Sequence, residues 1–222
     1  MAGLTFALPK GRILDQAIPF LAAAGLDLEQ PLREAGRKLQ LELESGDLVL
    51  LVKPTDVPTY VEYGVADIGI AGRDTLEEQA RDLYEPVDLG IGACRLAIAE
   101  HEQRPARIRR GASLRVATKY PRLATRHYLA KGVQAEIIPL YGSVELGAIT
   151  GLADQIVDLV ESGETLRQNG LKEVETIMPV TSRLVVHPAS LKLKIHAVSA
   201  FVEAIRGAVA RRSPLAKAAG AR

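Results

Sequence analysis

The stretch Ser162-Gly163-Glu164-Thr165 holds the residues best suited to chemistry. It separates the apolar run QIVDLV (155–160) from a segment with the character of a helix. Two hydroxyls, a flexible glycine and the backbone N–H groups of a helix start are typical of an anion site, above all for phosphate. The same residue types also cap ordinary helices. These four residues by themselves leave both interpretations open.

Carboxylates precede this stretch at Glu145, Asp154 and Asp158. Because side chains in a strand alternate with a period of two, the two aspartates share a face if their segment is a strand. Two carboxylates aimed at one site can bind sugar hydroxyls or a magnesium ion, although they can also serve only to solvate a strand end. Followed by a phosphate-binding loop, they fit a ribose 5-phosphate.

A basic turn stands near the start of the chain. Lys10 and Arg12 flank Gly11 directly after the apolar stretch LTFAL (4–8). Cations at a strand end are suited to further phosphates of the same ligand. Taken alone, they are equally typical of a solvated surface.

Other familiar catalytic patterns are missing from the sequence. The four histidines and Cys94 lack the spacing of zinc ligands, so we expect no metal site built by the chain itself. We expect Cys94 to be a packed thiol rather than a nucleophile. The sequence contains no G-x-S-x-G elbow, no Walker loop and no G-x-G-x-x-G fingerprint.

Composition narrows the class of protein. The chain has 222 residues, 47% of them hydrophobic, with 28 basic and 27 acidic residues. A general nucleic-acid binder normally carries a basic excess, and a lone cysteine excludes an internal disulfide. We find no secretory signal and no apolar run of membrane-spanning length. The sequence therefore predicts a cytoplasmic protein without nucleic-acid or membrane partners.

Strand-like and helix-like segments alternate along the chain, which favours an α/β fold with largely parallel sheets. In such sheets ligands bind beyond the carboxyl ends of strands, where the basic turn and the Ser162 stretch both lie. Apolar residues spaced three and four apart predict one long amphipathic helix near the end. These residues are Leu191, Ile195, Val198, Val202, Ile205 and Val209. The expected strands are 4–8, 40–44, 48–52, 66–72, 95–100, 114–118, 135–140, 155–160, 174–180 and 182–187, with 40–44 and 48–52 as a hairpin.

The segment from Glu145 to Leu166 resembles the signature of the ATP phosphoribosyltransferase family. It matches every specified position over 22 residues: the glutamate, a Gly-x-small triplet, an Ile-x-Asp-apolar run and a final Ser-Gly-x-Thr-Leu. The stretches LPKGRI (8–13), KPTDVPTYVEYGVADIGIAGRD (53–74) and VATKYPRLATRHY (116–128) extend the resemblance over about residues 3–210.

This resemblance implies a reaction and a fold. The family joins 5-phosphoribosyl 1-diphosphate to N1 of ATP, giving N1-(5-phosphoribosyl)-ATP and diphosphate, the first step of histidine biosynthesis. Mg²⁺ is expected to accompany the diphosphate of the substrate. The implied fold is a two-lobed type II periplasmic-binding-protein-like α/β fold with the active site between the lobes. The first lobe would hold 1–91 and 180–222, including the C-terminal helix, and the second lobe 92–179.

The resemblance also assigns roles to residues. The candidates for the charge of the nucleotide or the diphosphate are Lys10, Arg12 and Arg37. The expected phosphoribosyl-binding residues are Asp154 and Asp158 for the ribose, with Glu161, Ser162, Gly163, Glu164 and Thr165 around the 5-phosphate. Glu145 would support the ribose or the loop.

Length adds an expectation about assembly. The sequence stops one helix and a tail after SRLVVH (182–187), and it resembles the short form of the family, which lacks a regulatory domain. Short forms work with a histidyl-tRNA-synthetase-like regulatory subunit that carries feedback by histidine. We therefore expect a homodimer within a hetero-oligomer. The alternative is a two-lobed small-molecule binding or sensing domain without catalysis, because a fold does not fix a function.

Overall fold

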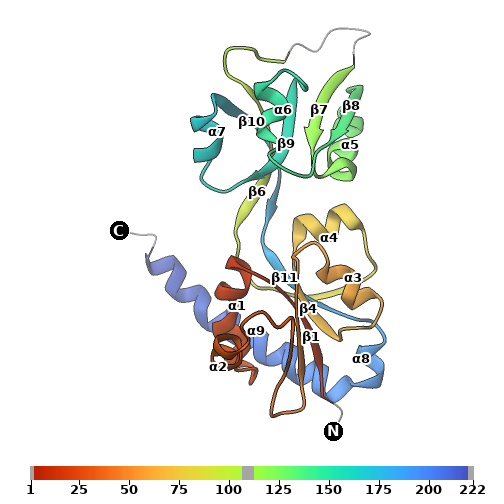
Figure 1. Cartoon of the computed structure of the whole chain (residues 1–222), viewed down its shortest axis with the longest axis vertical. Helices are drawn as coiled ribbons and strands as arrows, with labels where there is room; N and C mark the ends of the chain where they lie inside the picture. The colour runs from red at the N-terminus through yellow and green to blue at the C-terminus, as the bar shows by residue number, and fades with distance from the viewer. Residues whose placement is uncertain (1–2, 107–112, 220–222) are drawn as a thin grey trace. The chain divides into compact units, whose positions relative to one another are not determined.

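The computed structural model describes residues 3–106 and 113–219, with side chains as far as Arg212 (Figure 1). The chain forms two compact units. The first contains the chain up to Leu76, Ala80–Gly92 and the chain from Thr181 onward. The second contains Ala93–Val180 together with Glu77–Gln79. The chain therefore passes from the first unit to the second after Gly92 and returns after Val180.

The first unit is built on a six-stranded sheet with the order β2-β3-β1-β4-β11-β5. β3, β1 and β4 are parallel, whereas β2, β11 and β5 run antiparallel to their neighbours. Its strands are β1 (Thr5–Pro9), β2 (Gln40–Glu42), β3 (Leu48–Val52), β4 (Ile68–Gly72), β5 (Tyr84–Asp88) and β11 (Ser182–Val186). Its helices are α1 (Arg12–Ala23), α2 (Glu29–Glu34), α3 (Val57–Glu62), α4 (Arg73–Gln79, whose last residues belong to the second unit), α8 (Ser190–Leu193) and α9 (Ile195–Ala219).

Helices cover both faces of this sheet. α1 and α9 contact each other and pack on one face, where Phe20 and Ile205 meet strand residues such as Phe6 (Figure 1). On the other face Val57 and Val61 of α3 pack against Ala7, Ala71 and Val185. Burial on both faces explains why β1 and β4 are continuously apolar in sequence.

The second unit has a five-stranded sheet with the order β10-β6-β9-β7-β8. β9, β7 and β8 are parallel, whereas β6 is antiparallel to both β9 and β10. Its strands are β6 (Cys94–His101), β7 (Leu114–Thr118), β8 (Ala135–Pro139), β9 (Gln155–Val160) and β10 (Leu171–Val180). Its helices are α5 (Pro121–Ala130), α6 (Glu145–Ile149) and α7 (Glu164–Gln168).

Strand alternation divides the core of the second unit between two faces. Leu96 and Ile98 of β6 pack with α5, whereas Ala97 and Ala99 point to the opposite face with α6 and α7. Ile156 of β9 lies on that second face. The face that carries α6 and α7 is therefore lined by small β6 side chains.

Several expectations from the sequence are confirmed, whereas the largely parallel sheets and the unbroken C-terminal helix are wrong. The β2–β3 hairpin forms, and Pro58 lies in the first turn of α3. The sheets are mixed rather than largely parallel, because β11 and β6 carry the chain between units and run against their neighbours. The sequence also missed α2, β5 and α6, which are short and show little periodicity.

The expected long C-terminal helix is broken at Lys194. Its ammonium donates to Asp67 Oδ2 (2.8 Å) and to Gly3 O (3.0 Å). Asp67 also accepts from the Ser190 hydroxyl at 2.7 Å, so one buried carboxylate binds the first residue of α8 and the residue at the break. Ile195 is 52% exposed, so it lies outside the predicted apolar stripe. The contacts of Asp67 join segments far apart in the sequence, and no local pattern predicts them.

Within the described part of the chain, no helix combines the length and apolarity needed to cross a bilayer.

Candidate active site

A cavity of about 270 Å³ lies in the second unit, at the carboxyl end of β9. Its walls come from β6, from α6, from β9 and from the loop that leads into α7. The lining residues are Ala97, Ala99, Glu145, Ile156, Asp158, Leu159, Val160, Glu161, Ser162, Gly163, Glu164, Thr165 and Leu166. The sequence predicted this place as a binding site, and most of its expected phosphoribosyl residues line one cavity.

Small residues open this cavity and bring α6 close. Ala97 pairs in register with Asp158, so a methyl group stands beside the carboxylate on the same face. In α6, a Cβ on Gly147 would stand 2.7 Å from Ala117 Cβ, which is far below a normal contact. Glycine at this position lets α6 pack directly on β7. That packing holds Glu145, in the first turn of α6, at the cavity.

The loop after β9 has a fixed backbone. Gly163 has φ +76°, a left-handed conformation that side chains with a Cβ rarely adopt. Ser162 Oγ accepts from Glu164 N at 3.3 Å, and Arg95 Nη1 donates to Glu161 O at 2.9 Å. Arg95 is itself held by both oxygens of Glu173. Sequence reasoning missed Arg95, because nothing near it in the chain shows that it reaches this loop.

The polar side chains of the loop are not equivalent. Glu164 pairs with Arg167 and accepts from Gln168 within α7, so its carboxylate is already occupied. That pairing with Arg167 holds the pKa of Glu164 below its usual value. The Thr165 side chain is exposed and makes no hydrogen bond with the described residues. The Thr165 hydroxyl therefore stays available to a ligand.

Asp158 lines the cavity with a side chain that is only 16% exposed. Burial raises its pKa, and the negative charge of Glu145 acts in the same direction. The N–H of Leu159 (2.8 Å from Oδ1) and the ammonium of Lys119 (3.7 Å from Oδ1) oppose this rise. A carboxylate held out of water beside a second one is suited to grip a neutral hydroxyl donor.

Asp154 does not join Asp158. It precedes β9 and binds Arg115 instead, through the backbone N–H (2.9 Å) and the guanidinium (3.0 Å). Burial acts to raise the pKa of Asp154, but the hydrogen bonds from Arg115 outweigh it and the pKa is lowered. Asp154 stands one residue before the strand begins, and its carboxylate is bound by Arg115. Asp154 is absent from the residues that line the cavity.

The three basic candidates belong to the first unit. Lys10 and Arg12 stand together at the turn between β1 and α1, where Gly11 has φ +88°. Arg37 lies in a different segment of that unit, between α2 and β2. All three side chains are exposed. The position of Lys10 and Arg12 at the carboxyl end of β1 agrees with the place where a parallel sheet receives ligands.

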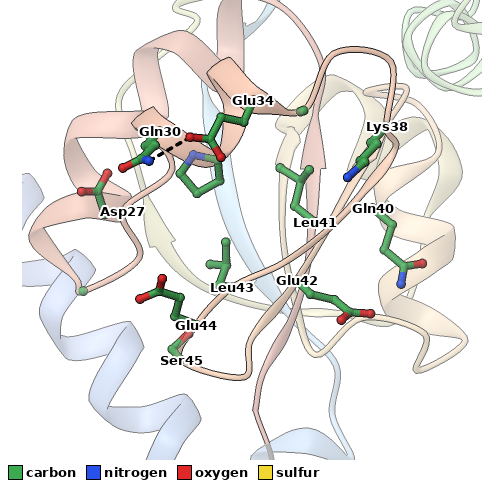
Figure 2. A pocket seen from close by; sticks show the side chains of 13 residues that line it. Asp27, Gln30, Glu34, Lys38, Gln40, Leu41, Glu42, Leu43, Glu44 and Ser45 are labelled. Carbon is green, nitrogen blue, oxygen red and sulfur yellow. Dashed lines mark hydrogen bonds between the residues drawn. The ribbon is translucent and has the colours of Figure 1, made fainter.

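A larger cavity of about 760 Å³ lies in the first unit, between α2 and the β2–β3 hairpin (Figure 2). Its polar lining side chains, among them Asp27, Glu34, Glu42 and Glu44, are all exposed. Figure 2 shows Gln30 bonded to Glu34 (2.8 Å) on its rim. No residue expected from the sequence to bind substrate lines it. The residues that the sequence predicts for substrate binding therefore lie outside the larger of these two cavities.

No group of three or more His, Cys, Asp or Glu side chains is placed to hold a metal ion among the residues that the structure describes. Cys94 is half-buried and packs against the core on the α5 face.

Comparison with known proteins agrees with the signature. The family model for ATP phosphoribosyltransferase matches residues 53–207. Two curated relatives are both named ATP phosphoribosyltransferase. One, from Methylobacillus flagellatus, is 51% identical over 93% of this chain and 98% of its own length. The other, from Burkholderia mallei (strain SAVP1), is 52% identical over 93% of this chain and 96% of its own length.

A solved structure gives the same result for the fold. The ATP phosphoribosyl transferase (HisG:HisZ) complex from Thermotoga maritima contains a chain that is 35% identical, with a TM-score of 0.81. The match covers 94% of this chain and 99% of that one. The fold is thus the expected two-lobed, type II periplasmic-binding-protein-like α/β fold. By its signature segment, its matched length and its architecture, this chain belongs to the ATP phosphoribosyltransferase family.

Proposed function

We propose that this chain transfers the phosphoribosyl group of 5-phosphoribosyl 1-diphosphate to N1 of ATP, releasing diphosphate, in the first step of histidine biosynthesis. The observation that carries the proposal is the cavity at the end of β9. It joins Glu145, Asp158 and the Ser162–Thr165 loop, three separate parts of one signature segment. Relatives that match nearly their whole length carry the name of this activity.

The cavity suits the two ends of a ribose 5-phosphate. The backbone N–H groups of the Ser162–Thr165 loop and the Thr165 hydroxyl would receive the 5-phosphate, since oriented amides in a glycine loop favour anions. Asp158 and Glu145 would accept hydrogen bonds from the ribose hydroxyls. Arg95 would act indirectly, because it holds the loop through Glu161 O.

The chemistry needs no covalent nucleophile. Diphosphate leaves the anomeric carbon with oxocarbenium character, and N1 of ATP attacks from the opposite face. The protein must align two polyanions and stabilise the charge that develops on the leaving group. Lys10, Arg12 and Arg37 are our candidates for the nucleotide or diphosphate charge. This division of labour explains why the sequence shows no catalytic triad or activated cysteine.

Magnesium would accompany the diphosphate of the substrate. Mg²⁺ in nucleotide and phosphate sites is held by one or two carboxylates together with phosphate oxygens. Asp158 and Glu145 offer two carboxylates at one cavity, which fits an ion that is completed by the substrate and not caged by the protein alone. The ion would supply neutralisation of the diphosphate charge.

We also propose that the chain works with a regulatory subunit that resembles histidyl-tRNA synthetase, as a homodimer within a hetero-oligomer. The related structure from Thermotoga maritima is a HisG:HisZ complex, and its catalytic chain is matched over almost its whole length. Histidine would then act on the complex. The cytoplasm, where ATP is available, is the proposed location.

Diphosphate release tests the proposal. The purified chain, alone and with the partner subunit, is mixed with ATP, 5-phosphoribosyl 1-diphosphate and Mg²⁺. We expect diphosphate only when both substrates are present. Omission of either substrate is the control. Substrate binding without diphosphate release, with the partner present, would favour the alternative of a two-lobed binding or sensing domain.

Calorimetry with histidine tests the regulatory arrangement. We expect the chain alone to bind no histidine and the complex to bind it, with a coupling of about 1–3 kcal/mol between histidine and substrate. Saturable histidine binding and inhibition of the chain alone would contradict the proposed division between two subunits.

A further inference from the structure

The side chains that line the cavity in the second unit carry negative charge only, although the proposed ligand has phosphate groups at both ends. Glu145, Asp158, Glu161 and Glu164 line it, and no Lys, Arg or His is present among the described lining residues. Backbone amides of the loop can serve one phosphate. A second anionic group at the other end of the ligand needs a cation that reaches the cavity from its edge.

The two arginines next to the loop already have other partners. Arg95 is held by both oxygens of Glu173 and donates to Glu161 O. Arg167 pairs with Glu164 and donates to Ser162 O at 3.3 Å. Both guanidinium groups fix the backbone of the loop. Neither is placed to meet the far end of a ligand that begins there.

Lys119 is placed differently. Its side chain is 43% exposed, and its ammonium lies 3.7 Å from Asp158 Oδ1, which is longer than a good hydrogen bond. The partner in this loose ion pair, Asp158, lines the cavity. Among the described residues the Lys119 ammonium makes no closer ion pair, so the ammonium can move to a ligand at little cost in free energy.

The backbone around Lys119 is rigid. Thr118 is fully buried and its hydroxyl donates to Val157 O at 2.6 Å. The Thr118 hydroxyl oxygen also accepts from Tyr120 N at 2.9 Å. Thr118 and Val157 are register partners in the parallel β7–β9 pair. The next residues on the two strands, Lys119 and Asp158, are therefore brought together by the sheet itself.

Sheet order indicates which end of the ligand Lys119 meets. β9 lies between β6 and β7, and the cavity extends over the β6 side, where Ala97 and Ala99 line it. Lys119 stands on the β7 side of Asp158. A ligand with its 5-phosphate in the Ser162 loop and its ribose at Asp158 therefore presents its other end toward β7.

We infer that Lys119 is a further substrate-binding residue: it pairs with Asp158 in the free protein and contacts the diphosphate oxygens of 5-phosphoribosyl 1-diphosphate in the complex. The transfer of the ammonium from Asp158 to the diphosphate leaves the carboxylate free for the ribose hydroxyls. This inference rests on the proposed function, because it uses the same ligand in the same cavity.

Calorimetric titration of the full chain tests the inference. Lys119→Met keeps the length of the side chain and removes its charge. We expect the Kd for 5-phosphoribosyl 1-diphosphate, and that for inorganic diphosphate, to rise about tenfold, as for the loss of one charge-assisted contact. The Kd for ribose 5-phosphate should stay unchanged. Lys119→Arg should restore most of the affinity for the diphosphate ligands.

Lys131→Met is the matched control, because Lys131 is also 43% exposed and also pairs with a carboxylate of this unit, Glu175. Thermal unfolding of each variant establishes that the fold is intact. Equal affinities of wild type, Lys119→Met and Lys131→Met would overturn the inference and leave the proposed function standing. An equal loss for ribose 5-phosphate would overturn the assignment to the diphosphate end. If the wild type binds no 5-phosphoribosyl 1-diphosphate, the proposed function itself fails.

Discussion

Two aspartates four residues apart, one just before β9 and one near its carboxyl end, have opposite surroundings. At the amino end, Asp154 is bound by Arg115, and its pKa is lowered. At the carboxyl end, Asp158 is buried beside Glu145 with only a loose contact to Lys119, and its pKa is raised. One aspartate is satisfied by the fold. The other is held in a state that the fold does not fully stabilise.

This difference supports the proposal that the ligand binds near Asp158. A carboxylate with complete partners contributes to stability, whereas a buried carboxylate with incomplete partners costs stability unless a ligand completes it. The carboxyl end of β9 lies at the cavity, as expected for an α/β sheet. The comparison predicts opposite effects for equivalent substitutions at the two ends.

The largest effect is expected for Asp158→Asn. Loss of a charged acceptor for the ribose hydroxyls should lower kcat/KM about 10–100-fold, which corresponds to about 1.5–3 kcal/mol. Steady-state kinetics with 5-phosphoribosyl 1-diphosphate as the varied substrate measure it. A variant with unchanged kcat/KM would remove Asp158 from the binding site and erase the contrast with Asp154.

The same variant should be more stable than the wild type at neutral pH. Because the pKa of Asp158 is raised in the folded protein, the folded state holds its proton more tightly than the unfolded state. This favourable contribution is present at low pH and is lost as the pH rises through the folded pKa. The gain in Tm of Asp158→Asn should therefore appear at pH 7 and vanish below about pH 4, the ordinary aspartate range.

Thr165→Val sharpens the contrast within the loop. The substitution keeps the side-chain volume and removes the hydroxyl that makes no hydrogen bond with the described residues. We expect the KM for 5-phosphoribosyl 1-diphosphate to rise about tenfold, as for a lost hydrogen bond to a charged group. The KM for ATP should change less. A change in the KM for ATP alone would show that the loop does not bind 5-phosphoribosyl 1-diphosphate.

Asp154→Asn should change stability and leave substrate binding intact. The lowered pKa of Asp154 makes its ionised form stabilising above the ordinary aspartate pKa, and this contribution is lost as the pH falls through the folded pKa. We therefore expect a lower Tm at pH 7. Because the side chain is 35% exposed, solvent screening limits the decrease to about 2 °C. Thermal scans at pH 7 and pH 3 measure it, and the difference should be smaller at pH 3. A tenfold loss in affinity for 5-phosphoribosyl 1-diphosphate would show that Asp154 takes part in substrate binding.

The smallest effect is expected in the larger cavity of the first unit. Glu42→Gln removes an exposed carboxylate from its lining, and we expect changes within about 0.5 kcal/mol in stability and no change in kinetics. Diphosphate release and thermal unfolding measured beside Asp158→Asn provide the comparison. A clear kinetic defect would show that this cavity also takes part in catalysis.

The sequence determined the chemistry of the loop and the approximate position of most strands. Ser162, Gly163 and Thr165 stand between an apolar run and a helix, and such local order needs no distant contact to be recognised. Gly163 is an example, because its left-handed φ is a property of the residue and its turn. Alternation and short apolar runs likewise reflect which face of a strand is buried.

Only the tertiary structure decided which charges meet. Arg95 binds Glu161 across 66 residues, Arg115 binds Asp154 across 39, and Lys194, at the break of the last helix, binds Asp67 across 127. The interaction between two charged side chains depends on their distance in space and on their burial. It therefore leaves no periodic pattern in the sequence from which the pair could be predicted. The spacing of Asp154 and Asp158 is therefore visible in the sequence, whereas the partner of each carboxylate, Arg115 for Asp154 and Lys119 for Asp158, depends on the strand packed beside it.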